Sequence, residues 1–140
     1  MHIAVEGFDG VGKSTAAKKL ADKLRVLLVD KPLHFLFHEE GDEEYIRIRD
    51  AVNKSTNKQF TGWFYGLGNI YLYEKFKGQN IITDRHILSN YCWSGAPETD
   101  YIFDAIYKTI GAPDFTFLIS AVPEVIEKRM KKRNPNDSDL

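Results

Sequence analysis

The stretch Gly7-Phe8-Asp9-Gly10-Val11-Gly12-Lys13-Ser14-Thr15 decides the fold of this chain. It contains a glycine, four further residues and then Gly-Lys-Ser, which is the pattern of a phosphate-binding loop. Glycines let the backbone turn tightly beside a phosphate, and successive N–H groups then form an anion nest. The stretch therefore predicts binding of a nucleoside triphosphate, with Lys13 at the β- and γ-phosphates and the Ser14 hydroxyl on Mg²⁺.

The segments on either side of this loop supply the context that it requires. Residues 2–6 read as a short, mostly apolar strand. After the loop, Ala17, Leu20, Ala21 and Leu24 recur at helical spacing, which predicts a helix over residues 14–24. The alternative is a glycine-rich turn that merely connects a strand to a helix and binds no ligand.

The rest of the chain alternates between strand and helix patterns. We expect strands at residues 3–6, 26–29, 81–83 and 115–119. We expect helices at residues 14–24, 43–53, 61–77, 89–93, 99–110 and 123–133, with Gly78 capping the third helix and Pro123 at the first position of the last. Residues 32–41 read as a loop. The order predicts an α/β fold of the P-loop NTPase class: three layers, with a central parallel sheet flanked by helices.

Length, charge and cysteine usage narrow the class of protein. The 140 residues suit one domain, and a net charge of −1 gives no sign of a nucleic-acid partner or of binding to a membrane surface. We see no transmembrane run and no signal-peptide pattern. Cys92 is the only cysteine, so no internal disulfide is possible, and we expect a cytoplasmic protein.

A second chemical signal is the run Ile81-Ile82-Thr83-Asp84-Arg85-His86. An apolar strand that ends in an acid suits the second half of a phosphate-loop site, where Asp84 would lie near Mg²⁺. Arg85 is a forked donor that suits a phosphate. The alternative is an Asp-Arg pair that caps a helix or lies on the surface.

A third signal is the basic end of the last predicted helix, which carries Arg129 and Arg133 four residues apart. This spacing places both on one face. They either close over a transferring phosphoryl group or form a solvated helix end whose cations complement the helix dipole.

Together these motifs resemble the thymidylate kinases, within the nucleoside-monophosphate kinases. Residues 5–15 are similar to that family's opening. The run Asp84-Arg85-His86-Ile87-Leu88-Ser89-Asn90-Tyr91-Cys92-Trp93-Ser94-Gly95 resembles its Asp-Arg-Tyr-x-x-Ser-x-x-Ala-aromatic-x-Gly motif. Residues 113–115 and 123–124, followed by the two arginines, resemble its fourth strand and the helix that enters the lid. The match covers most of the chain.

The resemblance implies Mg²⁺-dependent transfer of a phosphoryl group from ATP to a deoxynucleoside monophosphate, most simply dTMP to dTDP. ATP would be bound by the whole loop: Gly7, Phe8, Asp9, Gly10, Val11, Gly12, Lys13, Ser14 and Thr15. The acceptor nucleotide would be bound by Asp9, Phe64, Arg85, Ser89 and Trp93, and Mg²⁺ by Ser14 and Asp84. The residues that act on the transferring group would be Lys13, Asp84, Arg85, Arg129 and Arg133.

Departures from the family pattern leave the base of the acceptor open. The aromatic helix around Phe64 has no arginine where the family usually carries one, so its rings either stack on a base or pack in the core. Asp30-Lys31-Pro32 stands where the family has Arg-Glu-Pro. The family also continues past the lid, so we expect residues 1–140 to be a single P-loop kinase domain that lacks the completed lid and an edge strand.

Other functions remain open at this point. A deoxynucleoside kinase would share the loop and the sheet, although that family usually has Glu-Arg-Ser where this chain has Asp84-Arg85-His86. A nucleotide-binding module without catalysis is a third possibility. A GTPase is disfavoured, since we find no Asn-Lys-x-Asp motif. By analogy with the family, a homodimer is expected.

Overall fold

A computed structural model of the chain describes residues 1–37 and 43–133. Four strands form one parallel sheet in the order β2-β3-β1-β4. The strands are β1 (His2–Glu6), β2 (Leu27–Val29), β3 (Ile81–Asp84) and β4 (Phe115–Leu118). Each strand lies within one residue of the predicted range, so the predicted parallel sheet is confirmed.

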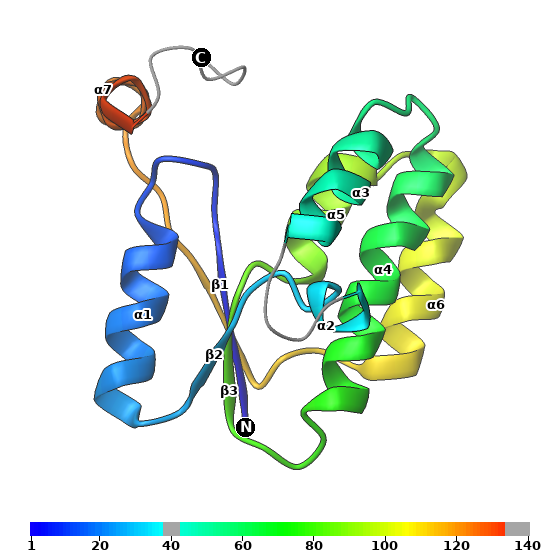
Figure 1. Cartoon of the computed structure of the whole chain (residues 1–140), viewed down its shortest axis with the longest axis horizontal. Coiled ribbons are helices and arrows are strands. Elements are labelled where there is room, and N and C mark those ends of the chain that lie inside the picture. The colour runs from blue at the N-terminus through cyan, green and yellow to red at the C-terminus, as the bar shows by residue number, and fades with distance from the viewer. Residues whose placement is uncertain (38–42, 134–140) are drawn as a thin grey trace.

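Helices cover the two faces of the sheet unequally (Figure 1). One face is covered by α1 (Lys13–Leu24), and the other side carries α4 (Lys58–Lys75), α5 (Ile87–Ser94) and α6 (Asp100–Ile110). The remaining elements are α2 (His34–Phe37), α3 (Glu43–Asn53), the short 3₁₀ helix η1 (Pro97–Thr99) and α7 (Pro123–Arg133). The predicted three layers are confirmed. Among the described helices, none is long and apolar enough to cross a bilayer.

The central strand β1 is buried along its whole length. It pairs with β3 on one side and β4 on the other, and its apolar residues Ile3 and Val5 pack with Ala17 and Ala21 of α1. In the parallel register Val5 lies opposite Asp84 and Glu6 lies opposite Leu118. The phosphate loop, the β3–α5 junction and the link to α7 therefore meet at one edge of the sheet, where the carboxyl ends of the strands lie.

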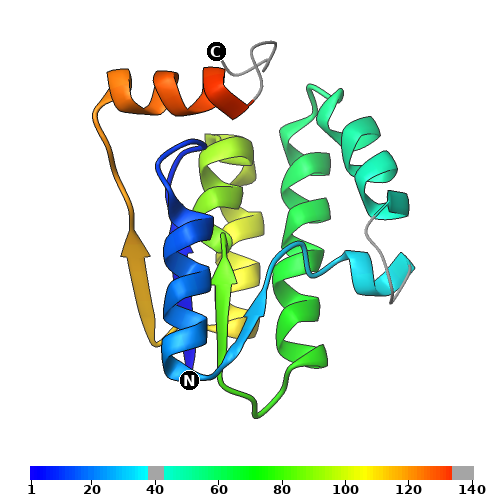
Figure 2. The same ribbon diagram turned by 60° about the vertical axis from the view of Figure 1, so that its left-hand side comes forward.

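The edge strand β4 differs from β1 in burial, because all four of its residues are exposed. It leads to α7, which runs across the top of the sheet above the phosphate loop (Figure 2). Pro123 is the first residue of this helix, as predicted.

Three local predictions were wrong. Residues 34–37 form α2 inside the predicted loop. Helix α4 begins at Lys58, three residues before its predicted start, because the Asn57 side chain accepts hydrogen bonds from the backbone N–H groups of Gln59 and Phe60. The same helix ends at Lys75 with Phe76 as its cap, and Gly78 lies beyond it in a left-handed turn. The polar run 134–140 and residues 38–42 lie outside the described residues.

Candidate active site

The phosphate loop connects β1 to α1 and borders a cavity of about 680 Å³. Its glycines Gly7, Gly10 and Gly12 have positive φ angles of 147°, 78° and 102°. A Cβ atom on Gly7 would lie 2.4 Å from the carbonyl oxygen of Ile119. Gly12 is the N-cap of α1 and contributes no side-chain cap, so the first turn of the helix faces the cavity with its N–H groups and its positive dipole end.

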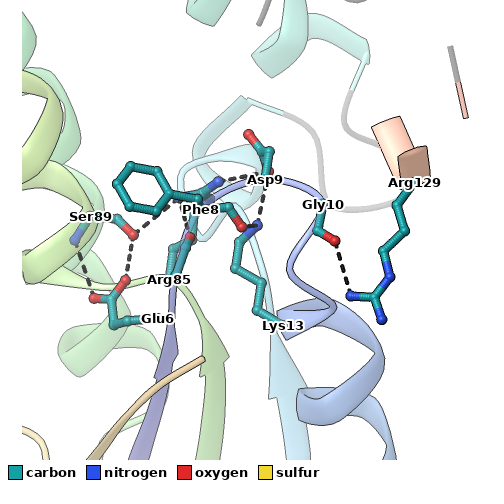
Figure 3. Close-up of polar contacts among 9 residues, drawn as sticks. Glu6, Phe8, Asp9, Gly10, Lys13, Arg85, Ser89 and Arg129 are labelled. Carbon is teal, nitrogen blue, oxygen red and sulfur yellow. Dashed lines mark hydrogen bonds and ion pairs between the residues drawn. The ribbon is translucent and has the colours of Figure 1, made fainter. Parts of the chain in front are cut away.

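Asp9 links two cations of the site, Lys13 and Arg85 (Figure 3). Its Oδ1 accepts hydrogen bonds from Lys13 Nζ and from Arg85 Nη2, both at 2.8 Å. Burial opposes ionisation of the Asp9 carboxyl, but the hydrogen bonds and charges of Lys13 and Arg85 outweigh it and hold its pKa below the usual value. Lys13 is 5% exposed, so an anion that enters the loop meets a desolvated cation.

Arg85 is held in place by both its backbone and its guanidinium group. Its φ is +76°, a conformation that an L-residue rarely adopts, and its N–H donates to the Val5 carbonyl at 2.9 Å. Nη1 donates to the Gly7 carbonyl at 3.3 Å and to Ser89 Oγ at 3.2 Å. The forked guanidinium group of Arg85 therefore bridges the phosphate loop and the start of α5.

A second cavity of about 680 Å³ lies on the other side of the loop. Arg85, Ser89, Trp93 and Asp9, all predicted acceptor residues, border it. Its other walls are mainly apolar and include Phe8, Leu88, Leu118 and Met130. Asp9 and Met130 border both cavities, so the two spaces adjoin.

Helix α7 packs on the phosphate loop. A Cβ atom on Gly10 would lie 2.9 Å from Met130 Cγ and 3.1 Å from Ile126 Cγ2, which shows how closely the two segments approach. Arg129 Nη1 donates to the Val11 carbonyl at 2.9 Å and to the Gly10 carbonyl at 3.3 Å. Arg129 and Arg133 both border the phosphate cavity, so both predicted α7 cations lie beside the loop.

The predicted Mg²⁺ ligands have the chemistry that a magnesium ion requires. Ser14 is an exposed residue that borders the phosphate cavity. Asp84, at the end of β3, borders neither of the two cavities, and its buried Oδ1 has no hydrogen-bond partner, so its role as a metal ligand stays a prediction. Within the described part of the chain, no group of three or more His, Cys, Asp or Glu side chains could hold a metal ion. A Mg²⁺ ion at a nucleotide takes one or two protein oxygen ligands together with phosphate oxygens, and a hydroxyl and a carboxylate are ligands of that kind.

Two further residues differ from what the sequence suggested. Phe64 does not border either of these two cavities; its ring stacks on Tyr45 with centroids 6.4 Å apart, so an acceptor role for it stays a prediction. Glu6, which sequence reasoning assigned no role, lies at the end of β1 with an exposed fraction of 1%. The signal available for it was a charged residue that ends an otherwise apolar central strand.

The family model for thymidylate kinase matches residues 5–140. A thymidylate kinase of Mycoplasma mobile is 31% identical over 157 residues, covering 100% of this chain and 75% of that protein. A probable thymidylate kinase of Archaeoglobus fulgidus is 29% identical, covering 95% of this chain and 70% of that protein.

Solved structures share the fold. Thymidylate kinase from Ehrlichia chaffeensis superposes with a TM-score of 0.66 at 22% identity, covering 96% of this chain and 88% of that one. Deoxyadenosine kinase from M. mycoides gives a TM-score of 0.62 at 22% identity, covering 100% and 74%. The chain belongs to the thymidylate kinase family of nucleotide kinases.

Proposed function

We propose that this chain transfers the γ-phosphoryl group of ATP to dTMP, giving ADP and dTDP. The observation that carries the proposal is that the phosphate cavity and the apolar cavity adjoin at Asp9, with Lys13 and Arg85 bonded to the same carboxylate oxygen. Transfer between two phosphates needs donor and acceptor sites that meet at one point. The names of the relatives support thymidylate as the acceptor.

In the proposed reaction an oxygen of the acceptor monophosphate attacks the γ-phosphorus in line. A new P–O bond forms, the bond between the γ-phosphorus and the bridging oxygen of the β-phosphate breaks, and its electron pair leaves on that oxygen as part of ADP. The loop N–H groups and Lys13 bind the donor phosphates. Arg85 holds the attacking phosphate, and Arg129 and Arg133 beside the loop offset the negative charge. Mg²⁺ held by Ser14 and Asp84 would supply further charge neutralisation at the donor phosphates.

The apolar cavity suits the base and sugar of a deoxynucleotide. Trp93, Phe8 and Leu88 offer flat or aliphatic surfaces that can pack against a base or a deoxyribose. Arg85 and Ser89 supply the polar contacts at the phosphate end. A site with this division binds an amphipathic acceptor in one orientation.

The proposed partners are the two nucleotides, with no nucleic acid and no membrane. We place the reaction in the cytoplasm, which the single cysteine and the family membership support. A homodimer by analogy with the family stays a prediction.

A mass-spectrometric acceptor screen tests the function. The protein is incubated with MgATP and a mixture of nucleosides and nucleoside monophosphates, with Lys13→Ala as the control. We expect dTDP to form with the wild-type chain and not with the variant. A new monophosphate would instead identify a deoxynucleoside kinase, which the fold shared with the M. mycoides enzyme keeps in view. No product at all would favour a nucleotide-binding module without catalysis.

A further inference from the structure

Glu6 places a carboxylate in the interior of the protein, directly before the phosphate loop. It is 1% exposed, although a buried carboxylate is costly unless donors surround it. Its Oε1 accepts hydrogen bonds from the backbone N–H groups of His86, at 2.9 Å, and Ser89, at 3.3 Å. Its Oε2 accepts from the Ser89 hydroxyl. The carboxylate thus receives the N–H groups of His86, the N-cap of α5, and of Ser89 in its first turn, where the helix dipole favours a negative charge.

These contacts fix the direction of the Ser89 hydroxyl. A serine hydroxyl has one hydrogen and two lone pairs. Because the hydrogen is donated to Glu6, the lone pairs are left for Arg85 Nη1, which donates to Ser89 Oγ at 3.2 Å. Glu6 does not bond to Arg85 among the described contacts; Ser89 lies between them and is hydrogen-bonded to both, as Figure 3 shows.

The guanidinium group has two other contacts, and both are to the phosphate loop. Nη1 also contacts the Gly7 carbonyl at 3.3 Å, and Nη2 contacts Asp9. Asp9 itself is shared with Lys13, which is expected to turn toward the donor phosphates when ATP binds. The Ser89 contact is therefore the one that ties the Arg85 fork to α5 rather than to the phosphate loop.

We propose that Glu6 is a positioning residue for the acceptor phosphate: by orienting the Ser89 hydroxyl, it holds the Arg85 fork toward the apolar cavity. This inference rests on the proposed function, since it concerns the affinity of the same site for a nucleoside monophosphate. A purely structural role, in which Glu6 only ties α5 to the end of β1, would affect both substrates and the stability together.

Glu6→Gln separates these two roles. The amide oxygen can still accept from the His86 and Ser89 N–H groups, so the junction between β1 and α5 is kept, but the amide nitrogen cannot accept the Ser89 hydrogen. We expect the KM for dTMP to rise about tenfold, as for the loss of one charge-assisted hydrogen bond, and the KM for ATP to change less than about twofold. The Kd for dTMP, measured by titration calorimetry, should rise by the same factor as the KM for dTMP.

A double-mutant cycle with Ser89→Ala tests the coupling. If Glu6 acts through the Ser89 hydroxyl, Glu6→Gln should add nothing to the effect of Ser89→Ala on dTMP binding. Glu74→Gln, which changes an exposed carboxylate of α4, is the matched control and should leave both KM values unchanged. Additive effects in the cycle would overturn the inference, as would equal rises in both KM values with a lower melting temperature.

The outcomes also separate the inference from the function on which it rests. If the wild-type chain phosphorylates no monophosphate, the proposed function fails and the inference fails with it. If the wild-type chain is active and Glu6→Gln has the same dTMP affinity, only the inference fails. Should Glu6→Gln not fold, Glu6→Asp keeps the charge on a shorter side chain; a selective rise in the KM for dTMP would support the inference, and an unchanged KM would overturn it.

Discussion

The two cavities of the site have the same volume, about 680 Å³, but they are built in different ways. The phosphate cavity is lined mainly by one continuous stretch, the loop and the first turn of α1, and the backbone supplies much of its chemistry. The apolar cavity is bordered by side chains from several separate segments, including the loop, α5, β4 and α7. The phosphate cavity therefore depends on the loop glycines and on Lys13, and changes there should affect every acceptor alike, whereas substitutions on the apolar side alter what a particular acceptor meets.

Loss of Lys13, the cation of the phosphate loop, should have the largest effect on the rate of phosphoryl transfer. Lys13→Ala removes a buried cation that borders the donor phosphates, so we expect the rate of phosphoryl transfer to fall by about 10³-fold or more for every acceptor. Steady-state kinetics with several monophosphates measures this. Lys18→Ala, on the exposed side of α1, is the control and should be neutral. A loss confined to one acceptor would contradict the division between the two cavities.

The backbone of the loop should tolerate no side chain at its first glycine. In Gly7→Ala the new Cβ would lie 2.4 Å from the Ile119 carbonyl oxygen at a φ of 147°. We expect the free energy of unfolding to fall by about 2 to 3 kcal/mol, measured by urea denaturation.

Gly78→Ala is the matched control for that measurement. It has a φ of 75° but nothing within 4 Å of the added Cβ, so it isolates backbone strain, for which we expect about 1 kcal/mol. Equal losses of unfolding free energy in the two variants would show that the close contact with Ile119, just after β4, does not constrain the loop.

The acceptor side should respond to a change of side-chain geometry with charge conserved. Arg85→Lys keeps a cation but removes the fork that contacts Asp9, Ser89 and the Gly7 carbonyl. We expect kcat/KM for dTMP to fall about 30-fold while the KM for ATP stays within about twofold. A parallel rise in the KM for ATP would mean that Arg85 serves the donor side.

A buried histidine pair, His2 and His86, should give the smallest of these effects, a change in how stability depends on pH. The rings of His2 and His86 lie 4.8 Å apart, and His2 bonds to Tyr73 and Thr83. Burial lowers the pKa of His2 to about 4, with the nearby Asp114 opposing the shift, and lowers that of His86 to about 3, with His2 adding to it.

Both pKa values are lower in the folded chain than the ordinary value of 6.5, so the stabilisation is complete above pH 6.5 and is lost as the pH falls toward 4 and 3. Between pH 7 and 5.5 we expect each of these groups to lower the free energy of unfolding on the order of 1 kcal/mol. His86→Leu should reduce the slope of stability against pH over this range. An unchanged slope would show that His86 does not remain neutral in the fold.

The same contrast explains how much the sequence could predict. The phosphate loop and the strand pattern are local features, so Gly7, Lys13 and all four strands were readable from spacing alone. The acceptor side depends on packing between distant segments. Glu6 meets Ser89 across 83 positions, and no local pattern marks that contact. Phe64 packs on Tyr45 because α3 and α4 pair, which residue type alone could not decide.

Adjoining donor and acceptor sites are the central claim. The most direct test is the affinity of a bisubstrate compound in which ATP and dTMP are joined through their terminal phosphates, measured by titration calorimetry and by competition. We predict that it binds more tightly than ATP or dTMP alone and competes with both, and that Lys13→Ala and Arg85→Lys each weaken it. Competition with ATP only, at an affinity no higher than that of ATP, would contradict the claim that the two cavities form one site.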